Sequence, residues 1–421
     1  MTSSKSLNFF LAALFLATLI VALNWPLNPI YGGDVEWYLK IFQGDIQDVI
    51  QPFSGRIFFP FLAGMAHYIF GIDAEHSFLF ITIAALYLLF LCLAVVLKKI
   101  LPFSLMLAPL LFMPYFAGIS SEYLLPDAFF LFSSTLFFVF LFYNQEIPAL
   151  LTLFFMFLTR ESIILFGLIF LCLSIYKGKR MLALGTFFII AISIFVTGQI
   201  NSLGIPNAHN LQSFLYFALK IPYYFFNNVL GISLWSNTLA NCDPIYNFAL
   251  PSWLPLGSIE RVGSCGFMPE AMLATFVALL TLLGIMPVVI FYLIRRNFQE
   301  IFRRLPFWFI VTVAYGASSY LISIFVTPSA ERFIGYAASA FILTVPFLMR
   351  EFLKINRNLL IKLSAIHMSL AWLPFVLRLA GWDYAATLQI FIIVIAIAAY
   401  LYTFYLLKGA LVQGGRQALA P

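Results

Sequence analysis

Two carboxylates stand one residue apart in the segment YGGDVEWYLK, residues 31–40. Asp34 could act there as a general base that removes a proton from an attacking hydroxyl. Asp34 and Glu36 together could instead hold a divalent metal ion, because such cations prefer carboxylate oxygens as ligands. The pattern is equally typical of a helix start, where Asp34 would be the N-cap and Glu36 would meet the positive end of the helix dipole.

Further charged residues that could do chemistry lie at the ends of apolar segments along the chain. They are Arg56, Glu122, Asp127, Arg160, Glu161, Glu331, Arg332, Arg378 and Asp383. The carboxylates could accept a proton or bind a substrate hydroxyl, and the guanidinium groups could hold a phosphate. The sequence contains no GxxxxGK[ST], HExxH, CxxC or GxSxG motif, so the chemistry of those motifs is not expected.

Each of these charged residues also has a structural interpretation. Arg56 could anchor the chain among lipid head groups, and Asp127 could cap its own helix. Arg160 and Glu161 belong to the segment TRES, which interrupts an apolar stretch, so they are expected to line an outward-facing cavity or to form a mutual ion pair. A surface ion pair is the alternative for Glu331 with Arg332, and structural positions beside a turn are expected for Arg378 and Asp383.

The elements that must position these residues are membrane helices. With 63% hydrophobic and 10% charged residues, the chain could not present a water-soluble surface. A run of about 20 apolar residues crosses a hydrocarbon core of about 30 Å as a helix. We therefore expect an all-α integral membrane protein, a single polytopic domain over residues 1–421 with about twelve transmembrane helices. The predicted spans are 8–24, 75–97, 100–118, 123–143, 147–159, 162–176, 181–199, 272–294, 306–326, 333–349, 359–378 and 385–407.

The basic residues determine the predicted orientation, because short cytoplasmic loops retain Lys and Arg. With both termini in the cytoplasm, sixteen of the 23 basic residues fall on the cytoplasmic side and seven on the outer side. Fourteen of the 17 acidic residues fall on the outer side, which reflects either solvation of the outer loops or an acidic active site there. The net charge of +6 favours contact with membrane lipids, in particular the anionic lipids of the inner leaflet, and not with nucleic acid.

Two outer segments, 25–74 and 200–271, are too long to be simple turns. The apolar stretch 57–71 in the first is short for a crossing, so we expect helices that lie in the membrane interface in both segments. Cys242 and Cys265 share the second segment, where an oxidising compartment would permit a disulfide. Two free thiols are the alternative.

Three short stretches in this order resemble the GT-C superfamily of polytopic membrane glycosyltransferases, which take a sugar from a polyprenyl-phosphate donor. They are Asp34-Val35-Glu36 followed by Tyr38, Pro126-Asp127-Ala128-Phe129, and Glu331-Arg332-Phe333. The segments TRES and PFSGRIFFPFLAG resemble that group more weakly. The matching pieces are spread over residues 31–349, and each lies on the predicted outer face.

The resemblance implies an inverting sugar transfer on the outer face of a bacterial-type cytoplasmic (inner) membrane, or of an equivalent luminal face. Asp34 would be the general base, and Arg160 or Arg332 would hold the donor phosphate. Arg56, Asp127 and Glu161 would contribute to substrate binding. No cofactor is required by this scheme, although a divalent metal at Asp34 and Glu36 could assist the leaving phosphate.

Two other functions fit the same outer charges. One is a flippase or transporter of a polyprenyl-linked lipid, and the other is a ligase or polymerase of lipid-diphosphate glycans. Transporters place polar sites near the middle of the bilayer, whereas the charged residues here concentrate at the outer helix ends, which favours an enzyme over a transporter. The sugar and the acceptor do not follow from the sequence.

Overall fold

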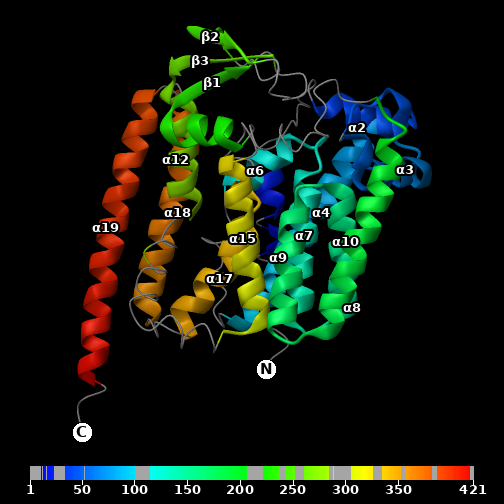
Figure 1. Ribbon diagram of the computed structural model, residues 1–421. Helices are drawn as coiled ribbons and strands as arrows, with labels where there is room; N and C mark the ends of the chain where they lie inside the picture. Colours follow the sequence, from blue (N-terminus) through cyan, green and yellow to red (C-terminus); the bar gives the residue numbers. More distant parts are fainter. Residues whose placement is uncertain are drawn as a thin grey trace.

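The computed structural model of the chain shows a bundle of upright helices with smaller elements at one end (Figure 1). The structure describes residues 11–22 without 12 and 16, 34–100 without 52, 114–205, 221–236, 242–251, 260–283, 288, 305–325, 334–351, 356–381 and 386–417. Arg332 with its neighbours Glu331 and Phe333, Asp383, and most of the predicted span 100–118 lie outside these residues.

Five described helices are long and apolar enough to cross a membrane. They are α4 (Ala74–Ile100), α10 (Arg180–Asn201), α15 (Phe307–Phe325), α18 (Arg357–Leu379) and α19 (Ala386–Gln417). Shorter helices accompany them, namely α6 (Pro114–Ser121), α7 (Asp127–Phe142), α8 (Glu146–Thr159), α9 (Ile163–Tyr176), α12 (Pro269–Leu283) and α17 (Ala338–Glu351). The expectation of a mostly helical membrane protein is confirmed, and the number of twelve spans stays a prediction.

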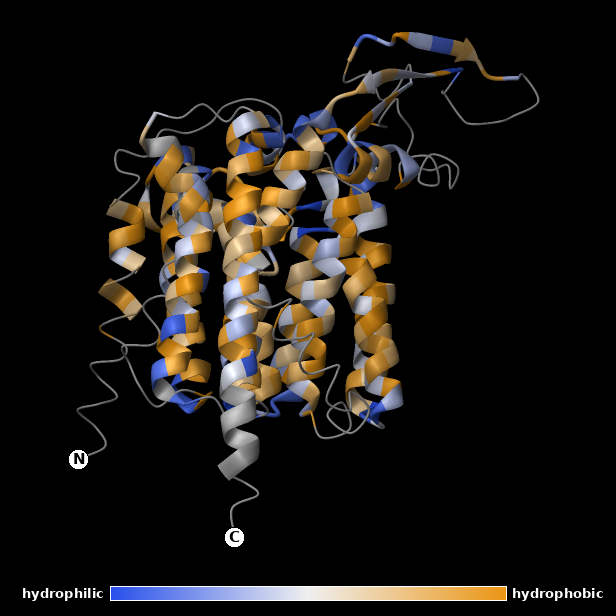
Figure 2. Ribbon diagram, turned by 90° about the vertical axis from the view of Figure 1, so that its left-hand side faces the viewer, coloured by the Kyte–Doolittle hydropathy of each residue, from blue (hydrophilic) through white to orange (hydrophobic). Residues whose placement is uncertain are grey.

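Helix α7 lies in the core of the bundle, where it packs against α4 and α8. Apart from Asp127 and the hydroxyls of Ser133, Ser134 and Thr135 its residues are apolar, as suits a helix enclosed by other helices. Edge-to-face ring contacts join its Phe137 and Phe138 to Phe166, Phe170 and Tyr315 of the neighbouring helices. Helices α10 and α19, by contrast, have only 22% of their most apolar stretch buried inside the protein, as helices that face lipid do. Figure 2 shows that hydrophobic residues predominate along the upright helices.

The first outer segment forms short helices at one end of the bundle: α2 (Asp34–Gln43), η1 (Ile46–Asp48), η2 (Phe53–Gly55) and α3 (Phe58–Phe70). An outer clamp, residues 49–55 against residues 201–205, ties this segment to the end of α10. Gln51 donates its backbone N–H to Ile205 O at 3.1 Å and its side-chain amide to Asn201 O at 2.8 Å, and Ser54 Oγ donates to Asn201 Oδ1 at 2.7 Å. The clamp therefore sets where α2 and α3 lie relative to the bundle.

The second outer segment departs from the all-α expectation. After a helical turn at 221–225 and η4 (Phe226–Leu230), the chain forms an antiparallel sheet with strand order β1-β3-β2, made of β1 (Ile232–Ser236), β2 (Tyr246–Ala249) and β3 (Arg261–Phe267). Cys242 and Cys265 are joined in a disulfide. Gly231 lies between η4 and β1, and Gly266 lies inside β3. Both have positive φ angles, which do not occur within a regular helix.

Basic residues gather at the opposite end of the bundle from α2. Arg350 donates to the C-terminal carbonyls of α4, and Lys99 of that helix lies 4.3 Å from the ring centre of Tyr143. Lys179 pairs with Glu146 at 3.7 Å. The disulfide-bonded sheet lies at the other end (Figure 1). The predicted orientation, with both termini in the cytoplasm, stays a prediction.

A substitution at Gly204 tests how closely the outer clamp is packed. A Cβ atom at this position would lie 2.5 Å from Val49 O and 2.8 Å from Ser54 Oγ. We expect Gly204→Ala to lower the free energy of unfolding by about 1–3 kcal/mol, because the clamp must shift to admit the methyl group. Gly198→Ala in α10 is the control, since nothing lies within 4 Å of a Cβ atom there. Thermal unfolding in detergent compares the two variants. Equal midpoints would show that the clamp admits the methyl group without a destabilising shift.

Candidate functional site

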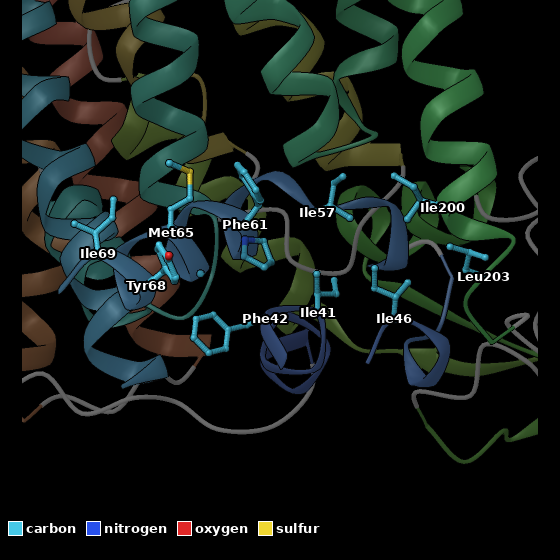
Figure 3. Close-up of a pocket in the computed structure, with 12 residues that line it drawn as sticks. Ile41, Phe42, Ile46, Ile57, Phe61, Met65, Tyr68, Ile69, Ile200 and Leu203 are labelled. Carbon is cyan, nitrogen blue, oxygen red and sulfur yellow. The ribbon is translucent and has the colours of Figure 1, made fainter. Parts of the chain in front are cut away.

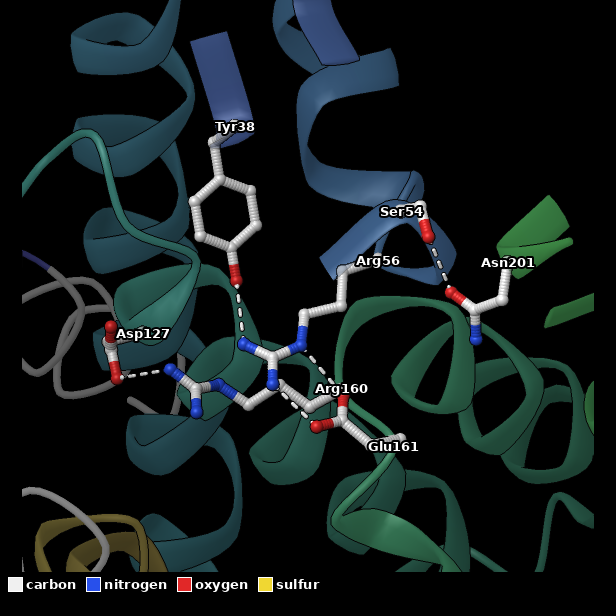
Figure 4. Close-up of polar contacts among 7 residues, drawn as sticks. All are labelled: Tyr38, Ser54, Arg56, Asp127, Arg160, Glu161 and Asn201. Atoms are coloured by element: carbon white, nitrogen blue, oxygen red, sulfur yellow. Dashed lines mark hydrogen bonds and ion pairs between the residues drawn. The ribbon is translucent and has the colours of Figure 1, made fainter. Parts of the chain in front are cut away.

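The site is organised by the break between α8 and α9. Helix α8 ends at Thr159, and Arg160 adopts extended backbone angles, φ −152° and ψ 125°. Side chains that follow one another in extended backbone point to opposite sides. Arg160 accordingly points into the bundle and Glu161 points away from it, so the mutual ion pair considered from the sequence does not form (Figure 4). Each residue pairs with a different element instead.

Arg160 and Asp127 form the buried pair. Arg160 Nη2 donates to Asp127 Oδ1 at 3.1 Å, and their side chains are 4% and 0% exposed. Asp127 is the first residue of α7, where the helix dipole favours a negative charge. The Tyr336 hydroxyl donates to the same carboxylate, and the Arg160 guanidinium lies 5.0 Å from the centre of the Tyr336 ring. This pair holds α7, the α8–α9 break and the turn before α17 together.

Arg56 and Glu161 form the outer pair. Arg56 donates through Nε and Nη2 to the two carboxylate oxygens of Glu161 at 2.7 and 2.5 Å, a bidentate arrangement (Figure 4). Arg56 Nη1 also donates to the hydroxyl of Tyr38 at 3.3 Å. The side chains of Arg56 and Glu161 are 11% and 47% exposed, so this pair is the more accessible of the two.

The two charges of the outer pair stabilise each other. Burial favours the neutral form of Glu161, but attraction to Arg56 and the hydrogen bonds from it outweigh burial and hold the pKa of the carboxyl below its ordinary value. Burial likewise opposes the charge on Arg56, and Glu161 and Tyr38 together raise the pKa of the guanidinium. Both groups are therefore ionised at neutral pH.

Helix α2 brings the acidic motif to the same region. Its buried face consists of Val35, Tyr38 and Ile41, and Asp34 precedes Tyr38 by four residues, which places both on one side of the helix. Asp34 is partly buried and Glu36 is exposed. Because both acids belong to the first helical turn, they diverge and do not form one metal-binding face. In the described parts of the chain, no group of three or more His, Cys, Asp or Glu side chains is placed to hold a metal ion.

An apolar groove of about 710 Å³ lies beside this region (Figure 3). Its walls come from α2, α3 and the end of α10, and they include Ile41, Phe61, Met65, Ile200 and Leu203. Ile57, the neighbour of Arg56 in sequence, also lines the groove. The lining is almost wholly hydrocarbon, so the groove suits an alkyl or isoprenoid chain and not a hydrophilic ligand.

The structure thus connects most of the residues that the sequence singled out. Arg56, Asp127, Arg160 and Glu161 belong to two linked ion pairs, and Asp34 lies one helical turn from Tyr38, which contacts Arg56. Arg332 lies outside the described residues, and the disulfide of Cys242 and Cys265 belongs to the separate sheet. Two site residues, Tyr38 and Tyr336, were not predicted to have a role in the site. Helical spacing was the available signal, because each follows a predicted site residue, Asp34 or Arg332, by four positions.

Removing one partner of the buried pair takes away the ion pair that offsets the cost of burying the other charge. We expect Arg160→Met to lower the free energy of unfolding by about 3–5 kcal/mol. The control is Lys179→Met, which breaks the more exposed pair with Glu146 and is expected to cost less than about 1 kcal/mol. Thermal or denaturant unfolding in detergent distinguishes them. A cost for Arg160→Met as small as that of the control would mean that Asp127 is neutral or solvated.

The outer pair predicts a pH dependence of stability. Since the pKa of Glu161 is lower in the folded than in the unfolded chain, its stabilising contribution is complete above the ordinary value of 4.5 and is lost as the pH falls through the folded-state pKa. We expect the difference in thermal midpoint between wild type and Glu161→Gln to stay constant from neutral pH to about pH 5 and then to shrink. A difference that persists unchanged to pH 3 would contradict the lowered pKa.

Comparison with protein families, curated proteins and solved structures gives no match. Two neighbouring features of the chain bear on its function. One is the two ion pairs, which are linked through the neighbouring residues Arg160 and Glu161. The other is the apolar groove, which Ile57, the residue after Arg56, helps to line.

Proposed function

We propose that this protein is a membrane glycosyltransferase that moves a sugar from a polyprenyl-phosphate donor to an acceptor on the outer face of a bacterial-type cytoplasmic membrane, or on an equivalent luminal face. One observation carries the proposal: the ion pair of Arg56 with Glu161 adjoins an apolar groove, because Ile57, the residue after Arg56, lines that groove. A ligand that fits both is amphiphilic, with a long hydrocarbon chain and an anionic head group. A polyprenyl-phosphate sugar has this chemistry.

Of the two described arginines in the ion pairs, Arg56 is the better placed to meet the donor phosphate. Its side chain is 11% exposed, whereas the side chain of Arg160 is 4% exposed and is committed to Asp127. A guanidinium has five N–H donors. Two of those of Arg56 bind Glu161 and one binds Tyr38, so two remain for phosphate oxygens. The buried pair then serves to hold the α8–α9 break, and with it Glu161, in place.

Transfer needs a base and a stabilised leaving group. In the proposed step the acceptor hydroxyl oxygen attacks the anomeric carbon and gives its proton to the carboxylate of Asp34. The bond between that carbon and the phosphate oxygen breaks, and the electron pair leaves with the lipid phosphate, whose charge Arg56 stabilises. Attack opposite the leaving group inverts the anomeric configuration. No metal is assigned to this step, because Asp34 and Glu36 diverge on α2.

The distribution of charge favours an enzyme over a flippase. In the five candidate spans, Asp, Glu, Lys and Arg lie in the first or last two turns. Where the described helices α7 and α17 meet in the bundle, a hydrogen bond joins two hydroxyls, Thr135 to Ser339 at 2.7 Å, and the buried titratable group in the middle of α18 is a histidine, His367. Transporters of charged lipids need charged or discontinuous sites near the middle of the bilayer. A ligase or polymerase of lipid-diphosphate glycans would use the same outer site and differs only in its donor.

The proposal is tested by sugar consumption from a panel of radiolabelled polyprenyl-phosphate hexoses and pentoses in proteoliposomes, with a native membrane fraction as the acceptor source. We expect Asp34→Asn to lower transfer by at least about 100-fold, as loss of a general base does. Glu36→Gln is the matched control on the same helical turn and is expected to keep near wild-type transfer. Full transfer by a folded Asp34→Asn protein would overturn the assignment of the base. Movement of intact donor between leaflets without transfer would favour the flippase.

A further inference from the structure

Tyr38 carries a hydroxyl that its packing does not need. The side chain is 0% exposed, and its ring meets Phe53 and Phe59 edge to face, with centroids 6.3 and 6.4 Å apart. A phenylalanine would fill the same space in this aromatic cluster. A hydroxyl buried among rings is tolerated when it has a hydrogen-bond partner, and here that partner is Nη1 of Arg56.

The contact between Tyr38 and Arg56 is sensitive to the position of α2. At 3.3 Å it is near the long limit for a hydrogen bond, so a small shift of either group strengthens or breaks it. Arg56 is itself fixed on its other side by the bidentate contact with Glu161. The hydroxyl of Tyr38 therefore links α2 to a guanidinium that Glu161 holds at the α8–α9 break.

Asp34 is carried by the same short helix. It lies four residues before Tyr38, about 6 Å along the axis on the same side. Helix α2 has only ten residues, and Gly44, with φ of +89°, follows its end. Such a short helix on the outer surface is oriented by its contacts and not by its own length. A rotation of α2 about its axis would move Tyr38 and Asp34 together.

On the basis of the proposed function, we infer that Tyr38 is a positioning residue that couples the phosphate-binding Arg56 to the base Asp34. When a donor phosphate binds Arg56, the Tyr38 hydroxyl keeps α2 in the orientation in which Asp34 points at the acceptor. Tyr38 touches neither the sugar nor the acceptor in this scheme. Its loss should therefore affect the rate of the chemical step and leave donor binding intact.

Tyr38→Phe tests this role, because it removes the hydroxyl and keeps the ring. With the panel sugar that the wild type consumes fastest, we expect kcat to fall about tenfold, as small displacements of a catalytic group do, with KM for the donor unchanged. The rise in thermal midpoint on adding polyprenyl phosphate without sugar should also be unchanged. Tyr87→Phe is the matched control, since it removes a hydroxyl bonded to Thr18 at 2.7 Å elsewhere in the bundle.

Phe59→Leu separates packing from positioning. It loosens the aromatic cluster around Tyr38 without touching the hydroxyl, so it should lower the thermal midpoint and leave kcat of the folded protein near the wild-type value. An unchanged kcat in Tyr38→Phe, or a loss of kcat matched by an equal loss in Phe59→Leu, would overturn the positioning role. Absence of sugar consumption by the wild type with every donor would instead overturn the proposed function, and with it the role of Tyr38.

Discussion

The extended backbone at Arg160 is the constraint on which the rest of the site depends. Because this one residue leaves the helical conformation, Arg160 and Glu161 point to opposite sides of the break between α8 and α9. One reaches Asp127 and Tyr336 inside the bundle, and the other reaches Arg56 in the first outer segment. A continuous helix through residues 159–163 would turn these two side chains about 100° apart and could not serve both partners.

The two ion pairs differ in burial, and the difference divides their roles. Asp127 and Arg160 are almost fully buried beside Tyr336, where an isolated charge would be costly and a matched pair with an added tyrosine donor is stable. Such a pair contributes rigidity and has no surface to offer a ligand. Arg56 and Glu161 lie at the edge of the bundle beside the apolar groove. In the proposed function the outer pair therefore meets the ligand, and the buried pair supports it.

The sequence predicted the charged participants better than their partners. Hydropathy located the long helices α4, α10, α15, α18 and α19, since apolar length is a strong signal for membrane spans. The interruption TRES marked the position of the break. Whether Arg160 and Glu161 pair with each other depends on the φ and ψ angles of one residue, which composition does not encode. The sheet was missed because strands of four to seven residues, with Gly263 and Gly266 inside β3, carry little periodic signal.

The position of the groove determines how a lipid substrate could reach the site. Phe61, Met65 and Ile69 of α3 are exposed where they line the groove, so its apolar wall is continuous with an apolar surface of the protein. Taking a hydrocarbon chain out of a bilayer into water costs about 0.8 kcal/mol per CH₂ group, which is prohibitive for a long isoprenoid. A groove that opens along such a surface lets the chain stay in an apolar environment throughout. Only the head group has to move, and Arg56, the residue before Ile57 of the groove, is the cation that the proposed function assigns to it.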